Sequence, residues 1–233
     1  MKNRLYNFEN LYNVRDIGGY KNSDGKLIRE KKYIRGTAKG TLTPAEKELL
    51  YSDGIRVVID LRNPYEINKI PHPLNGYKDI VYYNIDMIGS FDNMLERNYT
   101  VITQLYFDLI DYSQNQIRDV FKLLAKHENE SIYYSCTAGK DRTGIITFIL
   151  LSLVGIPEDE IIANYTESFE NNLPLDAKAP MHPKMEMYRY SKPEYIIDTM
   201  RYIQKKYGGP EKYLQHLGIS QAEIDRIKHS LLK

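Results

Sequence analysis

Residues 132–153, IYYSCTAGKDRTGIITFILLSL, decide the fold that the sequence predicts. The stretch opens with aromatic and β-branched residues at 132–134, which favour a buried strand. It closes at 145–153 with residues that are apolar on every side, which favour a buried helix. A strand that turns into a helix through a glycine-containing loop directs backbone N–H groups and the positive end of the helix dipole at one point. The sequence therefore predicts an anion site between the strand and the helix.

The loop of this anion site carries the side chains that phosphoryl transfer requires. Cys136 would supply a thiolate nucleophile, and Arg142 a planar guanidinium that holds two phosphoryl oxygens. The N–H donors that bind the anion also favour the thiolate over the thiol. Gly139 is expected to let the loop turn tightly, and Gly144 to let the helix pack close to the sheet. Thr143 is expected to donate its hydroxyl to the sulfur when the thiolate departs.

Composition favours one folded domain over residues 1–233. The chain is 42% apolar and 27% charged with a net charge of +1, which indicates a globular protein and argues against a general polyanion or nucleic-acid binder. Cys136 is the sole cysteine, which excludes an internal disulfide, a Cys-rich zinc site and a resolving thiol like that of low-molecular-weight arsenate reductases. Because the loop and Arg142 can stabilise the reacting charge, we expect no metal and no cofactor.

The apolar runs of the chain predict its location. The longest uncharged apolar run, at 143–156, is shorter than the about 20 residues that a membrane span takes. Residues 1–10 lack the apolar core of a signal peptide. We therefore expect a cytoplasmic monomer without a membrane span, and a secreted mature form is the alternative.

The CTAGKDRTG segment resembles the C-x(5)-R phosphate loop of cysteine-based phosphatases. It is similar to the AGKDRTG form found in bacterial tyrosine phosphatases that are also called triple-specificity or atypical lipid phosphatases. The resemblance implies an α/β fold of the protein-tyrosine-phosphatase type, with a central, mainly parallel sheet flanked by helices. It implies hydrolysis of phosphate monoesters, phosphotyrosine first, with phosphoinositides and phosphoserine or phosphothreonine as additional substrates.

The reaction expected for this loop proceeds through a phosphocysteine on Cys136. The residues expected to surround the phosphate are Thr137, Ala138, Gly139, Lys140, Asp141 and Arg142. The general acid has two candidates. The chain has no Trp, so the Trp-Pro-Asp loop that carries the acid in the usual tyrosine phosphatases is missing. Resemblance to the AGKDR subgroup favours Asp141, whereas Asp86 ends a predicted strand at 80–85, where dual-specificity phosphatases place their acid.

Two further segments resemble parts of the same family. The first, NVRDIGG at 13–19, is similar to an N-x-R-D-[IL]-G-G element, which implies that Arg15 and Asp16 brace the active-site loops. The second is Asp60-Leu61-Arg62 at the end of a predicted strand at 55–61, with Glu66 after it, and it also resembles a strand end of rhodanese sulfurtransferases. Asp60 and Arg62 are expected either to support the site from behind or simply to pair with each other or with the loop backbone.

One departure from the family pattern bears on activity. Ser135 stands where a His usually precedes the cysteine. The absence of that His is expected to weaken the ordering of the loop and the stabilisation of the thiolate. This departure and the missing Trp-Pro-Asp loop leave one alternative to the phosphatase, a phosphate-reading binding module with little catalysis. The Asp60-Leu61-Arg62 segment leaves a second, a rhodanese-like sulfurtransferase.

Apolar periodicity predicts the helices outside this region, at 43–51, 101–126, 158–169, 194–207 and 220–232, with a short one after Pro210. The stretch 170–193 differs in texture, since it contains four prolines and three methionines. We expect it to be either a surface connection or a lid with a soft apolar face over the site.

Overall fold

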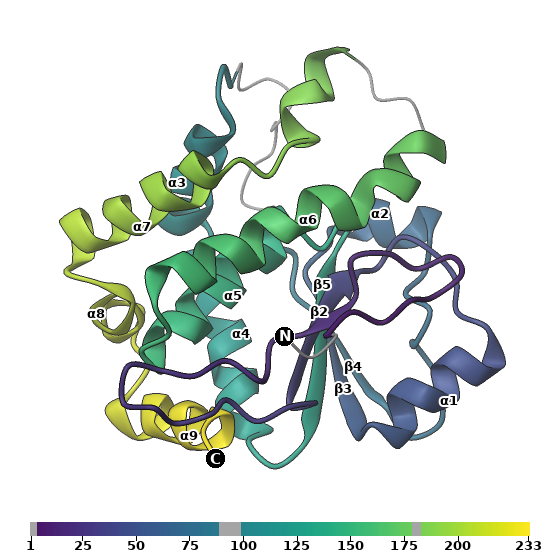
Figure 1. Ribbon diagram of the computed structural model, residues 1–233, viewed down its shortest axis with the longest axis horizontal. Helices are drawn as coiled ribbons and strands as arrows, with labels where there is room; N and C mark the ends of the chain where they lie inside the picture. The colour runs from purple at the N-terminus through teal and green to yellow at the C-terminus, as the bar shows by residue number, and fades with distance from the viewer. Residues whose placement is uncertain (1–3, 89–98, 179–182) are drawn as a thin grey trace.

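The computed structural model describes residues 4–88, 99–178 and 183–233. Its sheet has the strand order β1-β2-β5-β3-β4 (Figure 1). The strands are β1 (Arg15–Asp16), β2 (Tyr33–Thr37), β3 (Ile55–Asp60), β4 (Val81–Asn84) and β5 (Ser131–Cys136). β2, β5, β3 and β4 are parallel, and β1 alone among these strands pairs antiparallel, with β2. The predicted α/β fold with a mainly parallel sheet is thus confirmed, with β5 as its middle strand.

Helices cover both faces of the sheet. They are α1 (Pro44–Ser52), α2 (Pro64–Lys69), α3 (Ile102–Tyr112), α4 (Gln114–Lys126), α5 (Asp141–Leu153), α6 (Glu158–Lys178), α7 (Pro193–Tyr207), α8 (Pro210–His216) and α9 (Gln221–Leu231), with a 3₁₀ helix η1 (Pro183–Tyr188). In Figure 1, α1 and α2 lie to the right of the sheet, and α4, α5 and α9 lie to its left. No helix within the described residues combines the length and the apolar character needed to cross a bilayer.

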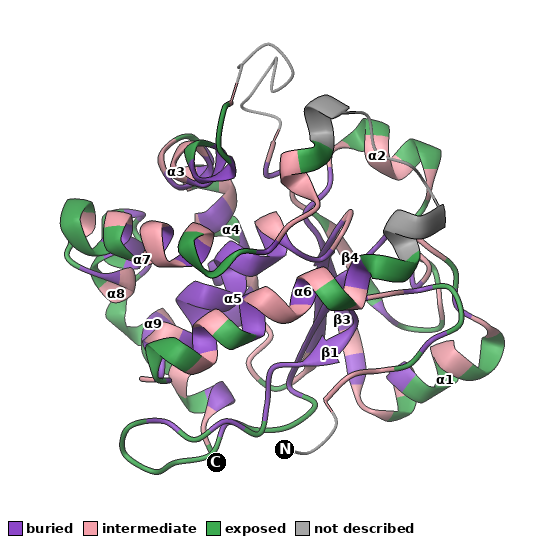
Figure 2. Cartoon of the chain, turned by 45° about the horizontal axis from the view of Figure 1, so that its top comes forward, coloured by how far each residue is buried: buried purple, intermediate pink, exposed green. Residues whose placement is uncertain are grey.

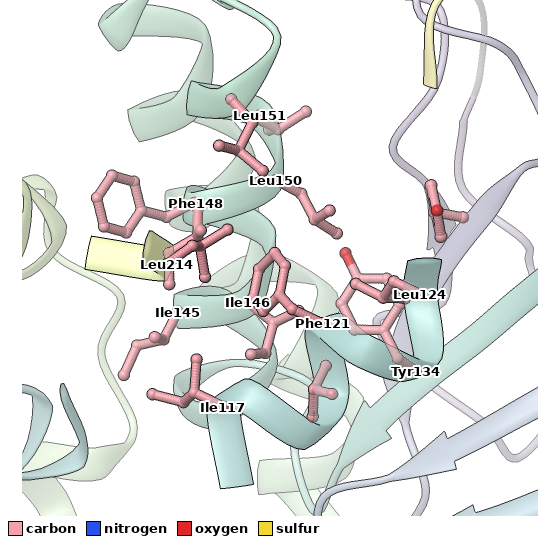
Figure 3. Close-up of a cluster of buried hydrophobic side chains, with 14 of the residues drawn as sticks. Ile117, Phe121, Leu124, Tyr134, Ile145, Ile146, Phe148, Leu150, Leu151 and Leu214 are labelled. Atoms are coloured by element: carbon pink, nitrogen blue, oxygen red, sulfur yellow. The ribbon is translucent and has the colours of Figure 1, made fainter. Parts of the chain in front are cut away.

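The alternation of side chains along β5 divides the core in two. Ile132 and Tyr134 enter the larger core, which α3 to α9 cover, whereas Tyr133 enters the smaller core, which α1 and the N-terminal segment cover. In the larger core, Tyr134 lies near Phe121 of α4 and Ile146 of α5 (Figure 3). Each fully buried side chain of this size contributes about 1.5–3 kcal/mol. This packing fixes α5, and with it the loop that precedes α5.

The helix α5 is buried on all sides, as its apolar sequence predicts (Figure 2). The helix α6 lies across it, with buried residues on one side and exposed residues on the other. Gly144 of α5 makes this contact close, because a Cβ there would lie 3.2 Å from the ring of Tyr165 in α6. The nearest neighbour of Gly144 is thus a helix, and a side chain of the sheet, Arg35 of β2, also lies 3.9 Å from such a Cβ.

Two predicted helix boundaries are wrong. The predicted helix at 101–126 is two helices, α3 and α4, that meet at Ser113. Ser113 has φ −97° and ψ 28°, and its buried hydroxyl donates a hydrogen bond of 2.6 Å to the Met87 carbonyl. This tertiary contact breaks the helix, while the apolar periodicity continues across the break. The helix predicted at 158–169 extends to Lys178 and passes through Pro174.

Candidate active site

The loop after β5 lies at the carboxyl edge of the sheet, between the segments that follow β2 and β3. Cys136 is the last residue of β5 and is 2% exposed. On one side the Cys136 carbonyl accepts a hydrogen bond of 2.8 Å from Ala38 N, and on the other the Ser135 carbonyl accepts one of 2.8 Å from Leu61 N. Open α/β sheets bind ligands at this edge, so the fold places the cysteine where the sequence analysis expected it.

Side chains from outside the loop hold three successive loop carbonyls. The Thr137 carbonyl accepts a hydrogen bond from the Thr37 hydroxyl. The Ala138 carbonyl accepts from Asn13 Nδ2 at 2.9 Å and from Asn172 Nδ2 at 3.0 Å. The Gly139 carbonyl accepts from Asn13 Nδ2 at 3.1 Å and from Arg35 Nη2 at 2.7 Å. In a trans peptide, the N–H of the next residue points opposite to the carbonyl. The N–H groups of Ala138, Gly139 and Lys140 therefore point away from these outer partners, as an anion cradle requires.

The close approach of the loop to β2 requires a glycine at position 139. Gly139 has φ +62°, a backbone conformation that side chains disfavour. A Cβ at this position would lie 2.4 Å from the carbonyl carbon of Gly36. Both the turn and the packing therefore exclude a larger residue, as the sequence predicted for the turn.

Arg142 is held by Glu66 of α2. Its guanidinium donates to the two carboxylate oxygens at 2.7 and 2.8 Å and to the Leu61 carbonyl at 3.2 Å. Glu66 Oε1 also accepts a hydrogen bond from the Thr137 hydroxyl. Burial by itself raises the pKa of the Glu66 carboxyl, but Arg142 outweighs burial and lowers the pKa to about 2. The ionised pair fixes the orientation of the guanidinium at the start of α5.

The two candidate acids lie in different places. Asp141 is the first residue of α5, and its Oδ1 accepts a hydrogen bond of 2.5 Å from the Tyr106 hydroxyl. Asp86 follows β4, and its Oδ1 accepts a hydrogen bond of 2.9 Å from Ile88 N. β4 is separated from β5 by β3, a spacing of about 10 Å in the plane of the sheet. The structure thus places Asp141 at the start of α5. Asp86 lies beyond β4, between Ile85 and Met87, whose N–H groups donate to the Asp60 and Leu61 carbonyls.

Lys140 joins the loop to the segment after η1. Its ammonium is buried and donates to the carbonyls of Tyr188 and, at 2.9 Å, Tyr190. It also lies 3.4 Å from Asp141 Oδ1. Among its described residues, the stretch 170–193 therefore contacts the loop through Asn172 at one end and through the Tyr188 and Tyr190 carbonyls at the other. Residues 179–182 of that stretch lie outside the described residues.

Comparison with known proteins agrees with this geometry. A family model described as the tyrosine phosphatase family matches residues 6–233. The chain belongs to this family. It is 29% identical over 216 residues to a tyrosine-protein phosphatase of Nostoc commune, with 84% of this chain and 72% of the relative covered. It is 26% identical over 229 residues to a putative tyrosine-protein phosphatase of Cupriavidus necator, with 89% and 82% covered.

A third relative carries a more specific name. The chain is 30% identical over 139 residues to the triple specificity protein phosphatase PtpB of Mycobacterium tuberculosis, with 52% of this chain and 50% of the relative covered. The resemblance found in the sequence is therefore confirmed, and the chain is a protein-tyrosine phosphatase. The family assignment favours this activity over the sulfurtransferase alternative.

The motif at 13–19 reaches the phosphate loop of this phosphatase mainly through Asn13. Arg15 donates to both oxygens of Asn13 and, from Nη2, to the Asn164 carbonyl at 2.6 Å and the Ser168 hydroxyl at 3.0 Å. Arg15 thereby ties Asn13 to α6. Asp16 instead accepts from the N–H groups of Gly18 and Lys31, at 2.8 and 2.6 Å.

Asp60 and Arg62 pair with each other in the tyrosine phosphatase, which is one of the two arrangements that the sequence left open. The Arg62 guanidinium donates to Asp60 at 2.7 and 2.9 Å, and the pair is almost completely buried. Arg62 also donates to the Ile70 carbonyl at 2.8 Å. The pair thus fixes both ends of the segment that carries α2 and Glu66.

Two hydroxyls near Cys136 are buried and, among the described residues, have no hydrogen-bond partner: those of Ser135 and Thr143. The contact expected between Thr143 and the Cys136 sulfur is not made here and stays a prediction for the second chemical step. The Ser135 side chain stands where the family pattern has His, and its hydroxyl bonds to no described residue. The loop of this phosphatase is instead held by the outer donors. Within the described residues, no group of three or more His, Cys, Asp or Glu side chains could hold a metal ion.

Sequence reasoning did not assign a role to the residues of this phosphatase that hold the loop from outside. These are Asn13, Arg35, Thr37, Glu66, Tyr106 and Asn172. Local signals existed for Asn13, which opens the motif at 13–19, and for Glu66. Asn63-Pro64-Tyr65-Glu66 is a capping box with proline at the first helical position, and the structure forms this box at α2. A helix predicted there would have placed the Glu66 carboxylate at its first turn.

Proposed function

We propose that this enzyme hydrolyses phosphate monoesters, phosphotyrosine first, through a phosphocysteine on Cys136. One observation carries the proposal. The Cys136 thiol, the N–H groups that oppose the three held carbonyls, and the Arg142 guanidinium meet within one loop between β5 and α5. A thiolate surrounded by N–H donors and a fixed guanidinium suits attack on a phosphate dianion.

The proposed reaction has two steps. In the first step, the Cys136 sulfur forms a bond to phosphorus as the bond from phosphorus to the leaving oxygen breaks, and Asp141 gives that oxygen a proton. In the second step, Asp141 takes a proton from water as the water oxygen attacks phosphorus. The phosphorus–sulfur bond then breaks, and phosphate and the thiolate are released. Thr143 is the donor proposed for the departing sulfur.

Asp141 is preferred over Asp86 as the acid because of its position. Asp141 belongs to the loop itself, so it needs no separate segment to bring it to the leaving oxygen. Asp86 instead lies on the segment beyond β4, which bonds to the end of β3 and belongs to no part of the loop. The acid assignment therefore rests on Asp141, with Asp86 as the alternative that the experiments below compare.

The surroundings of Lys140 support phosphotyrosine as the first substrate. An ammonium group has three donors, and this one already has three oxygen contacts, from Tyr188, Tyr190 and Asp141. A second phosphate of a phosphoinositide would have to displace one of them. The Mycobacterium tuberculosis relative is named a triple specificity protein phosphatase, which supports a substrate range wider than phosphotyrosine alone. The additional substrates proposed here, phosphoserine, phosphothreonine and phosphoinositides, rest on the resemblance of the loop.

The proposed mechanism also bears on where the enzyme works. Cys136 has to remain a free thiol, and a reducing cytoplasm maintains thiols. We therefore propose a cytoplasmic enzyme that acts as a monomer on phosphorylated proteins. Light scattering of the purified chain would test the monomer, and a mass twice that of the chain would contradict it.

The decisive experiment is hydrolysis of para-nitrophenyl phosphate in the presence of a chelator. We expect turnover without added metal, inhibition by vanadate, and loss of turnover in Cys136→Ser with phosphate binding retained. Turnover that survives in Cys136→Ser would overturn the cysteine mechanism. A wild-type protein that binds a phosphopeptide tightly and releases no phosphate would instead identify a binding module. Thiocyanate formation from thiosulfate and cyanide would identify a sulfurtransferase.

A further inference from the structure

A chain of two buried tyrosines ends on Asp141. The Tyr106 hydroxyl of α3 lies 2.5 Å from Asp141 Oδ1, and the Tyr165 hydroxyl of α6 lies 2.6 Å from that of Tyr106. Both residues are at most 2% exposed, and their rings meet edge to face with centroids 6.2 Å apart. The chain of hydrogen bonds therefore links three separate elements of the fold, α6, α3 and α5.

The acceptor at the end of this chain fixes its direction. A carboxylate oxygen only accepts, so Tyr106 donates to Asp141. Because Tyr106 has one proton to give, the bond between the tyrosines is donated by Tyr165. Burial, together with the Asp141 charge, raises the pKa of both phenols well above the ordinary value. Both tyrosines therefore stay neutral donors throughout the working pH range.

The two oxygens of Asp141 consequently differ. Oδ1 faces the Tyr106 hydroxyl and, at 3.4 Å, the Lys140 ammonium. Within residues 4–88, 99–178 and 183–233, no hydrogen bond to Oδ2 is formed. A proton carried by Asp141 must therefore sit on Oδ2, because Oδ1 is already engaged by two donors.

We propose that Tyr106 is a positioning residue for Asp141, and that Tyr165 holds Tyr106 in place. The Tyr106 hydroxyl fixes the carboxyl so that Oδ2 carries the proton to the leaving oxygen and takes one from water in the second step. This inference rests on the proposed role of Asp141 as the acid. Tyr106 itself touches neither the phosphate nor the nucleophile, so its effect passes through the carboxyl group alone.

The charged and titratable groups that act on Asp141 come from four elements. They are Lys140 and Arg142 of the loop and α5, Tyr106 of α3, Tyr165 of α6 and Tyr188 of η1. Removal of the Tyr106 hydroxyl takes one donor from the carboxylate and leaves both cations. Because a hydrogen-bond donor favours the charged form of its acceptor, we expect the alkaline limb of the kcat profile of this variant to move to higher pH.

The test is Tyr106→Phe, which keeps the ring and removes the hydroxyl. We expect kcat for a phosphotyrosine peptide to fall roughly tenfold, the loss that one hydrogen bond to a charged group represents, with KM within about twofold. An aryl phosphate with an acidic leaving group should lose much less, and the alkaline limb should rise. Tyr165→Phe should give the same pattern with a smaller loss of kcat. If Tyr106→Phe does not fold, Tyr165→Phe takes its place in the test.

The matched control is Tyr213→Phe. Tyr213 is also fully buried, and its hydroxyl donates to the Ile110 carbonyl of the same helix α3 at 2.7 Å. This variant loses one buried hydrogen bond on α3 without touching Asp141. We expect reduced thermal stability with kcat, its leaving-group dependence and its pH profile unchanged. The same kinetic pattern in Tyr213→Phe and Tyr106→Phe would overturn the positioning role.

A double-mutant cycle separates this inference from the acid assignment. If Tyr106 acts through Asp141, Tyr106→Phe adds nothing in an Asp141→Asn background. An equal loss in both backgrounds would overturn the positioning role while the acid assignment stands. A large loss of kcat in Asp141→Asn, with no change in Tyr106→Phe, would likewise overturn the positioning role and leave the acid assignment standing. An Asp141→Asn variant with wild-type kinetics would overturn the acid assignment and, with it, this inference.

Discussion

The Glu66 carboxylate and the Arg142 guanidinium face each other in a two-pronged ion pair, with both N–O distances below 3 Å. The pair joins the first turn of α2 to the first turn of α5, two helices that follow different strands of the sheet. Glu66 also accepts the Asn63 N–H at 3.0 Å and so caps its own helix. The Glu66 carboxylate therefore orients the phosphate-binding Arg142 and also caps α2, the helix on which Glu66 itself lies.

Glu66→Gln should lower kcat/KM for para-nitrophenyl phosphate by about 10- to 100-fold, since the amide retains one hydrogen bond and loses the charge that orients Arg142. Steady-state kinetics checks this. The control is Glu223→Gln, which changes the corresponding capping-box residue of α9, remote from the loop. Equal losses in the two variants would show that helix capping, rather than the ion pair, determines activity.

Acid should weaken the fold through the same pair. The pKa of Glu66 is about 2 in the folded state, whereas an unfolded glutamate titrates at about 4.3. The pair therefore contributes its full stability above the unfolded value and loses it as the pH falls from about 4.5 to 2. The contribution is on the order of 3 kcal/mol. Denaturant unfolding between pH 7 and 2.5 should show a shallower pH dependence in Glu66→Gln. Parallel curves for the two proteins would contradict this prediction.

Asp141→Asn should slow hydrolysis of phosphotyrosine by about 10²–10⁴-fold, the usual contribution of general acid catalysis. An aryl phosphate whose leaving group is acidic should be slowed much less, and one limb of the pH profile should flatten. Asp86→Asn is the comparison variant. If it shows this pattern and Asp141→Asn does not, the acid is Asp86 and Asp141 braces the loop.

Gly139→Ala should abolish most activity and destabilise the fold. The added Cβ would lie 2.4 Å from the backbone of β2, so the loop must move. Gly76→Ala is the control, because Gly76 also has a positive φ, of 73°, but no atom lies within 4 Å of an added Cβ. Strain alone should cost about 1 kcal/mol there and leave kcat intact. Normal kcat in Gly139→Ala would show that the loop does not depend on this packing.

The stretch 170–193 stays open between connector and lid. Removal of residues 175–184 should alter activity on bulky phosphopeptides more than on para-nitrophenyl phosphate if the stretch covers the site. Comparison of kcat/KM on the two substrates measures this. Equal effects would make it a plain connection.

The sequence predicted the nucleophile and the arginine because strand, loop and helix are local. The two oxygens of Asp141 could not be distinguished in the same way, because Tyr106 and Tyr165 reach it only after α3 and α6 have packed against α5. The predicted helix at 101–126 failed for a related reason. Its break depends on the hydrogen bond from Ser113 to Met87, a contact between segments that no periodicity records.

The hydrogen bond from Asn172 to the Ala138 carbonyl has a consequence for synthesis. A ribosome completes Cys136 and Arg142 before it makes Asn172 of α6, and Asn164 and Ser168 of the same helix hold Arg15 and Arg35 beneath the loop. A nascent chain thus has its nucleophile, and the earlier donors Asn13, Thr37 and Arg35, before α6 supplies Asn172 and holds the two arginines in place. Hydrolysis should therefore begin only after α6 has left the exit tunnel, and chains arrested before residue 172 should be inactive.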